Sequence, residues 1–205
     1  FSGEAYNVEQ GVTNDLFPQE RDEAAGCRSN PTPESSTHFE ASGPLVVPRD
    51  VVMFAAFMRM LAPPTPMPDT DTIVRGRKLF SDVGCVLCHT ATLHTGKMAM
   101  AALRDKDVNL FSDLLLHNMG PGLADDVNQG NARGDEFRTA PLWGLGKRIF
   151  FLHDGRTKDL LEAIQAHASA GNGTYPASEA SQVSGRFNNL TEIDKQHVLN
   201  FLRSL

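Results

Sequence analysis

The sequence predicts a mainly α-helical protein with long loops and an irregular N-terminal arm. Several segments repeat apolar residues with the period of a helix, and segments with the alternation typical of strands are sparse. Turn-forming residues and acids crowd residues 1–48, where no periodicity is sustained. We therefore expect an irregular arm over residues 1–48 and a helical domain over residues 49–205.

The arm is expected to pack on the folded body, because it carries large apolar side chains: Phe1, Tyr6, Leu16, Phe17 and Phe39. A disordered tail, or the tail of a preceding domain, is the alternative. A length of 205 residues is compatible with one domain and a large extension, at roughly 150 residues per domain.

The first helix is predicted over Arg49 to Leu61. One face repeats apolar residues at helical spacing: Val51, Phe54, Ala55, Met58 and Ala62. Prolines 63 and 64 end this helix, and further prolines form a stiff connector to about Asp69.

The second helix is expected to begin at a cap formed by Asp71 or Thr72 and to end near Ser81. Its inner face is predicted to carry four residues: Ile73, Gly76, Arg77 and Phe80. The stretch from Thr90 to Arg148 mixes apolar residues with glycine turns, so we expect a long loop with short elements.

Two more helices are predicted near the C-terminus. Thr157 caps the first, which runs to about Ala170 with Leu160, Leu161 and Ile164 inward. Thr191 caps the second, whose inner stripe consists of Val198, Phe201, Leu202 and Leu205.

Composition excludes several classes of protein. A formal net charge of -6 argues against a nucleic-acid partner, and three cysteines are too few for a disulfide scaffold. No apolar run approaches the roughly 20 residues of a transmembrane helix. The N-terminal residues lack the features of a signal peptide, so the chain is expected to be processed or cut from something longer.

The segment from Cys85 to His89 has the sequence C-x-x-C-H, which is the spacing that attaches a c-type haem. Two thiols one turn apart can each add to a vinyl group on the same porphyrin edge, and His89 follows at once to bind iron. A zinc site would need a second ligand pair, and Cys27 with scattered histidines makes a poor one. A thioredoxin-like redox pair would need a βαβ setting, which the sequence lacks.

Small c-type cytochromes pack the helix before this motif against the C-terminal helix at a glycine–aromatic contact. Gly76, Phe80 and Phe201 are placed for such a contact, although ordinary helix packing predicts the same residues. The sixth iron position has several candidates: Met98, Met100, Met119, His94, His117, His153 and His167. His167 shares the apolar face of its helix, where a core role and a ligand role are equally favoured.

The segment from about residue 70 to the C-terminus resembles the C-terminal haem domain of the bacterial di-haem cytochrome c peroxidase superfamily, in particular its di-haem oxidoreductase (thiol oxidoreductase) branch. Besides the haem motif, the blocks that carry the resemblance are 111–125 (FSDLLLHNMGPGLAD), 137–145 (FRTAPLWGL), 151–156 (FLHDGR) and 157–167. Residues 6–27 resemble the stretch that precedes this domain. The resemblance implies a cytochrome c-like haem domain.

The resemblance also implies a sixth ligand. In the peroxidases the axial methionine follows the histidine of the His-Asp-Gly block by fourteen residues, and here that position is occupied by His167. This departure implies that His89 and His167 both bind the iron. Family members carry two haems, whereas this chain has one C-x-x-C-H motif, so the peroxidatic haem is expected to lie outside it.

We therefore interpret the chain as an electron-transfer c-type cytochrome domain with one covalent haem c, the relay half of a di-haem peroxidase-like oxidoreductase. Its partner would be a redox protein or a second haem domain. A haem peroxidase or thiol oxidoreductase with an open iron site, and a small-ligand haem sensor, are the alternatives. Whether the chain is itself an enzyme is left open.

His153 and Arg156 are expected to shape the haem surroundings, for example by a hydrogen bond to a propionate; a turn and a helix cap explain these residues equally well. Cys27 is expected to be a free thiol or to pair in a missing partner. Some relatives bind calcium, and the sequence leaves calcium open here. Because bacteria attach haem to this motif outside the cytoplasmic membrane, we expect an exported, periplasmic protein.

Overall fold

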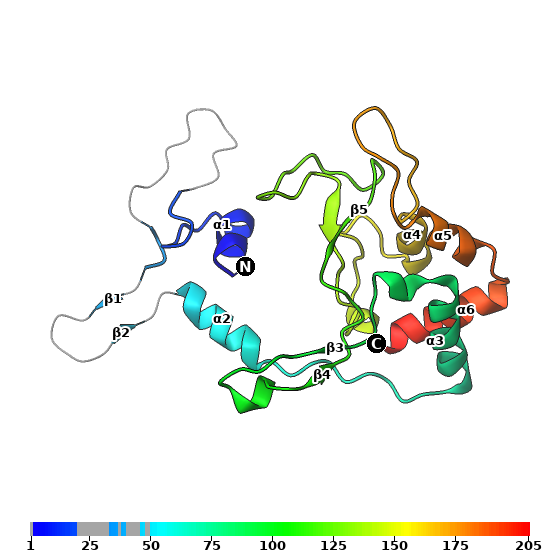
Figure 1. Ribbon diagram of the computed structural model, residues 1–205, viewed down its shortest axis with the longest axis horizontal. Coiled ribbons are helices and arrows are strands. Elements are labelled where there is room, and N and C mark those ends of the chain that lie inside the picture. The colour runs from blue at the N-terminus through cyan, green and yellow to red at the C-terminus, as the bar shows by residue number, and fades with distance from the viewer. Residues whose placement is uncertain (1, 20–32, 37, 40–45, 48–49) are drawn as a thin grey trace. The chain divides into compact units, whose positions relative to one another are not determined.

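The structure is a computed structural model that describes residues 2–19, 33–36, 38–39, 46–47 and 50–205. It divides into two compact units, Phe1–Ala62 and Pro63–Leu205 (Figure 1). Helices dominate, and strands within the described ranges form only two-stranded antiparallel ladders. The mainly α class is therefore confirmed, and no helix in the described part of the chain is long and apolar enough to cross a membrane. Cys27 lies outside the described residues.

Unit 1 contains helix α1 (Ser2–Gln10), helix α2 (Asp50–Met60) and the strand pair β1 (His38–Phe39) and β2 (Val46–Val47). Helix α1 lies in the arm that we expected to be irregular. Its buried residues are Gly3 and Asn7, so it lacks the apolar stripe by which helices are recognised in a sequence. Helix α2 belongs to this unit rather than to the haem domain, since Phe54 and Tyr6 have ring centroids 5.6 Å apart.

Buried polar groups hold the arm in addition to the contact of Tyr6 with Phe54. Asn14 is fully buried; its amide donates to the carbonyl of Gly3 at 2.8 Å and its side-chain oxygen accepts from the Leu16 backbone N–H at 3.1 Å. Leu16 and Phe17 are 62% and 37% exposed, and the predicted packing of the arm on the folded body stays a prediction. Phe1 and the side chain of Phe39 lie outside the described residues.

Helix α2 has the predicted extent but not the predicted buried face. Of the expected inner residues, Val51 is buried, whereas Phe54 and Met58 are 51% and 62% exposed. Within unit 1, the short helix α1 is the helix that packs against α2, and it covers only part of this apolar surface.

Unit 2 contains the rest of the described secondary structure. Its α-helices are α3 (Asp71–Val83), α4 (Leu160–Gln165), α5 (Ser181–Asn188) and α6 (Glu192–Ser204). Its 3-10 turns are η1 (Cys85–Leu87), η2 (Ala101–Leu103) and η3 (Leu145–Lys147). Its strands pair as β3 (Leu93–His94) with β4 (Asp107–Val108) and β5 (Leu116–Asn118) with β6 (Glu136–Arg138).

Helix α3 is fixed at both ends by local signals. The hydroxyl of Thr70 accepts from the Ile73 backbone N–H, one residue before the predicted cap, and Gly84 ends the helix in the left-handed region at a φ of 100°. Its buried face is Ile73, Gly76, Leu79, Phe80 and Val83. The side chain of Arg77, predicted to face inward, is half-exposed: its guanidinium donates to Asp69 at 2.9 Å and lies 5.5 Å from the centre of the Phe201 ring.

Helices α3 and α6 cross at Gly76, as the sequence predicted (Figure 1). A Cβ atom built on Gly76 would overlap the carbonyl oxygen of His197 and would lie 2.8 Å from the Cβ of Phe201. The rings of Phe80 and Phe201 meet edge to face with centroids 5.4 Å apart. Phe201 is fully buried, so this crossing is the centre of the core of unit 2.

The C-terminal helices differ in how well they were predicted. Thr191 caps α6 as expected, with its hydroxyl accepting from the Asp194 backbone N–H at 3.1 Å. Asp159, not Thr157, caps α4, and the helix ends at Gln165 rather than near Ala170. Helix α5 was not predicted, because Phe187 is its only buried large apolar residue.

Candidate haem site

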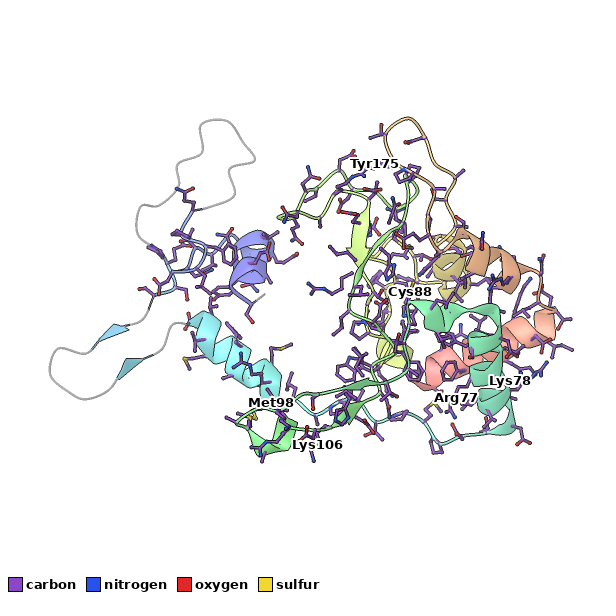
Figure 2. All side chains as sticks on the ribbon, in the orientation of Figure 1. Arg77, Lys78, Cys88, Met98, Lys106 and Tyr175 are labelled. Carbon is purple, nitrogen blue, oxygen red and sulfur yellow. The ribbon has the colours of Figure 1, made fainter. Side chains whose placement is uncertain are left out.

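The haem motif lies where α3 ends. Gly84 turns the chain into η1, and the backbone N–H of His89 donates to the carbonyl of Cys85 at 2.9 Å. This single tight turn keeps both thiols and the following imidazole in one short loop. Cys85 and Cys88 are free thiols and are partly buried. Figure 2 shows Cys88 in the middle of unit 2, beside the end of α3.

His89 is held in the geometry of a metal ligand. Its Nδ1 lies 3.0 Å from the carbonyl oxygen of Phe111, to which it donates its proton, so that Nε2 keeps its lone pair. Burial lowers the pKa of His89 to about 4, which leaves the imidazole neutral at neutral pH. A neutral imidazole with one nitrogen held and the other free is suited to bind iron.

The imidazole of His167 is also held by a hydrogen bond to a backbone carbonyl. It follows the last turn of α4, and its Nδ1 lies 2.8 Å from the carbonyl oxygen of Ala163. Burial lowers its pKa, although the hydrogen bond to Ala163 opposes the shift. The imidazole of His167 is therefore buried, as the sequence predicted, although α4 ends at Gln165, before His167.

The structure brings the imidazole rings of His89 and His167 close together. Their ring centroids lie 6.4 Å apart, and their planes are inclined by 53°. Two metal–imidazole bonds of about 2.0–2.1 Å, with half the width of each ring added, place the centroids of two axial imidazoles about 6 Å apart. The separation of the two centroids is therefore close to that of two imidazoles bound to one metal ion.

Three phenylalanine rings pack beside the imidazole of His89. The ring of Phe80 lies 6.2 Å from that of His89 and contacts Phe111 and Phe201 edge to face. Leu161 and Ile164, predicted to face inward, are partly buried against the same core. Packed aromatic and apolar side chains of this kind exclude water and lower the local dielectric constant around a redox group.

Most of the other candidates for the sixth position are engaged elsewhere or lie away from His89. Met98 and Met100 are 44% and 40% exposed, and Met98 lies near η2, far from Cys88 in the view of Figure 2. His94 pairs with Asp107 at 2.8 Å on the surface. His117 bonds to Asp113 and Glu179.

His153 and Arg156 make contacts with the protein itself. The imidazole of His153 stacks on Phe137 with centroids 4.3 Å apart, and its Nε2 lies 3.7 Å from Asp125. The guanidinium of Arg156 donates to the carboxylate of Asp154 at 2.6 Å and to the carbonyl of Gly122 at 2.9 Å. These contacts order the turn before α4; a role for either residue towards a propionate stays a prediction.

Sequence reasoning did not find the groups that orient the imidazoles. The carbonyls of Phe111 and Ala163 are backbone atoms, so residue types at these positions give no signal. Sequence reasoning also did not place Asp113, His117 and Glu179 beside Cys88, because Asp113 and His117, Glu179 and Cys88 come from three separate segments.

The comparisons with known proteins are consistent with a haem protein. The family described as "Di-haem oxidoreductase, putative peroxidase" matches residues 2–205. No curated protein matches significantly.

Two solved structures are similar. Hydrazine synthase of Kuenenia stuttgartiensis, pressurized with xenon, is 21% identical over 76% of this chain and 55% of that chain, with a TM-score of 0.49. A MauG-like protein associated with microbial copper homeostasis is 22% identical over 67% of this chain and 47% of that chain, with a TM-score of 0.40. The matched region spans about half the length of each of these proteins.

Proposed function

Because the chain belongs to the di-haem oxidoreductase family, we propose that it is an electron-transfer c-type cytochrome domain that carries one covalently attached haem. The observation that supports this best is the close pair of imidazoles, those of His89 and His167, whose centroids lie 6.4 Å apart. Both imidazoles donate Nδ1–H to a backbone carbonyl, which leaves both Nε2 atoms as ligands.

The bound haem would supply an iron that takes up and releases one electron. The sulfurs of Cys85 and Cys88 hold the ring, and His89 and His167 hold the iron. The carbonyls of Phe111 and Ala163 fix the orientation of the two imidazoles, so little reorganisation accompanies electron transfer. Phe80 and Phe201 exclude water from this side of the site.

The domain would pass electrons to a second haem domain or to a separate redox protein. The matched family is described as di-haem, whereas this chain has one C-x-x-C-H motif, which supports a second haem domain as the partner. We further propose that the protein works in the periplasm, where haem is attached to such motifs.

Covalent attachment predicts that the intact mass of the natural product exceeds that of the chain by one haem. The haem should stay with the protein in acidified acetone, because thioether bonds survive that treatment. Cys85→Ala and Cys88→Ala should each retain one thioether, which the pyridine haemochrome spectrum reports. Extraction of free haem from the unaltered protein would contradict covalent attachment.

Low peroxidase turnover is a second expected result. If His89 and His167 fill both axial positions, peroxide has no open coordination site on the iron. Turnover of the isolated chain with hydrogen peroxide and an electron donor should therefore stay near that of free bis-imidazole haem. A fast, saturable rate from spectrally homogeneous protein would instead support the alternative function, a peroxidase with an open iron site, which the description of the family favours.

A further inference from the structure

His167 lies on a tight turn just beyond α4, and this turn lacks the regular bonds of a helix. The backbone N–H of His167 donates to the carbonyl of Ile164 at 3.2 Å, which is one residue nearer than in an α-helix. The carbonyl of Ala163, which an α-helix would offer to that N–H, accepts from the imidazole of His167 instead. The position of the turn therefore depends on contacts with the chain that follows it.

Ser178 makes two of these contacts. Its hydroxyl donates to the carbonyl oxygen of His167 at 2.6 Å, and its backbone N–H donates to the carbonyl of Ser169 at 2.9 Å. Ser178 lies near the start of α5, and α4 and α5 pack side by side (Figure 1). One residue thus bonds two carbonyls of the segment that carries the imidazole.

The hydroxyl of Ser178 is itself fixed in direction. Its oxygen accepts the backbone N–H of Ala180 at 3.2 Å, and its single proton goes to the carbonyl of His167. Ser178 is 5% exposed, so water competes little for these bonds. A Cβ atom built on Gly120 would lie 2.9 Å from the backbone nitrogen of Ser178, so the turn at Gly120 packs closely behind the serine.

We propose that Ser178 is a positioning residue for the sixth iron ligand, an inference that rests on the proposed ligation of iron by His167. Its hydroxyl holds the backbone of His167, while the carbonyl of Ala163 holds the imidazole. Groups that orient a metal ligand raise the population of the bound geometry. The bond from Ser178 therefore keeps the imidazole on the iron and small ligands off it.

A serine with a merely structural role would stabilise the fold without affecting the iron, and Ser204 provides that comparison. Ser204 is 3% exposed, and its hydroxyl donates to the carbonyl of Phe201 in α6, also at 2.6 Å. Ser178→Ala and Ser204→Ala therefore each remove one buried bond from a serine hydroxyl to a backbone carbonyl.

The experiment follows the binding of cyanide to the ferric, haem-loaded protein by stopped-flow absorbance. Cyanide can bind only while the imidazole of His167 is off the iron, so the rate reports how often that ligand is released. We expect Ser178→Ala to bind cyanide about 2–10-fold faster, the factor that corresponds to one net hydrogen bond. Ser204→Ala should bind it at the rate of the unaltered protein, and urea unfolding should show a similar loss of stability in both variants.

His167→Ala separates this proposal from the one on which it rests. If the ferric spectrum of His167→Ala stays low-spin, ligation by His167 is wrong and the role of Ser178 falls with it. If that spectrum becomes high-spin, the role of Ser178 alone is overturned when Ser178→Ala binds cyanide at the unaltered rate or Ser204→Ala accelerates it equally. Added to His167→Ala, Ser178→Ala should have no further effect; a further acceleration would show that the hydroxyl does not act through His167, which also overturns its role.

Discussion

Replacing His167 by alanine is expected to convert the haem iron from low spin to high spin. Among the described residues, His167 has the imidazole that lies against His89, and alanine has no atom that reaches the metal. The ferric visible spectrum should therefore change to that of an open site, and carbon monoxide and cyanide should bind readily. His167→Met should raise the reduction potential if the thioether sulfur reaches the iron.

The control for this experiment is His94→Ala. His94 lies at the surface and pairs with Asp107, so its removal should leave the spectrum low-spin. A low-spin, unchanged spectrum in His167→Ala would show that the sixth ligand lies elsewhere. Met119 would then be the next candidate, because His117 is held by two carboxylates.

Gly76→Ala is expected to destabilise unit 2 strongly. The new Cβ would overlap the carbonyl of His197, which belongs to the backbone of α6 and cannot rotate away. Separating the two helices would also open the contact between Phe80 and Phe201. We expect the free energy of unfolding to fall by at least about 3 kcal/mol, the upper part of the range for overpacking. Urea unfolding followed by circular dichroism measures it.

Gly185→Ala is the matched control, because it adds the same methyl group inside helix α5. A Cβ at Gly185 meets no atom within 4 Å, and alanine is a better helix former than glycine. The control should therefore raise the free energy of unfolding by up to about 1 kcal/mol. If Gly76→Ala behaves like Gly185→Ala, the close crossing of α3 and α6 is wrong.

The helices that were predicted best are defined by sequence features that lie within or next to the helix itself. Helices α3 and α6 combine a threonine cap, a repeating apolar face and, for α3, a glycine in the left-handed region. Their crossing was predictable because glycine opposite an aromatic residue indicates close approach of two backbones. The haem motif itself is a contiguous sequence and needs no tertiary information.

The parts that were missed depend on distant residues. The apolar residues of α2 have helical spacing, but spacing does not reveal whether a neighbour covers them. Helix α5 contains Gly185 and several polar residues, so tertiary packing of Phe187 stabilises it rather than intrinsic propensity. His117 was one of several histidines in the sequence, and only the fold places it beside Cys88.

The crossing of α3 and α6 has a consequence for the order in which the protein matures. Arg75 of α3 pairs with Asp194 of α6 across 119 positions of chain, and contacts so distant in sequence form slowly. A helix of 13 residues is marginal until its partner docks, so the cysteines remain accessible during that interval. Once the core has closed, burial raises the pKa of Cys85 to about 12, and its thiol becomes a poor nucleophile. If haem is attached as we propose, thioether formation is favoured before the C-terminal helix docks, and a chain that folds first without haem buries the thiol of Cys85.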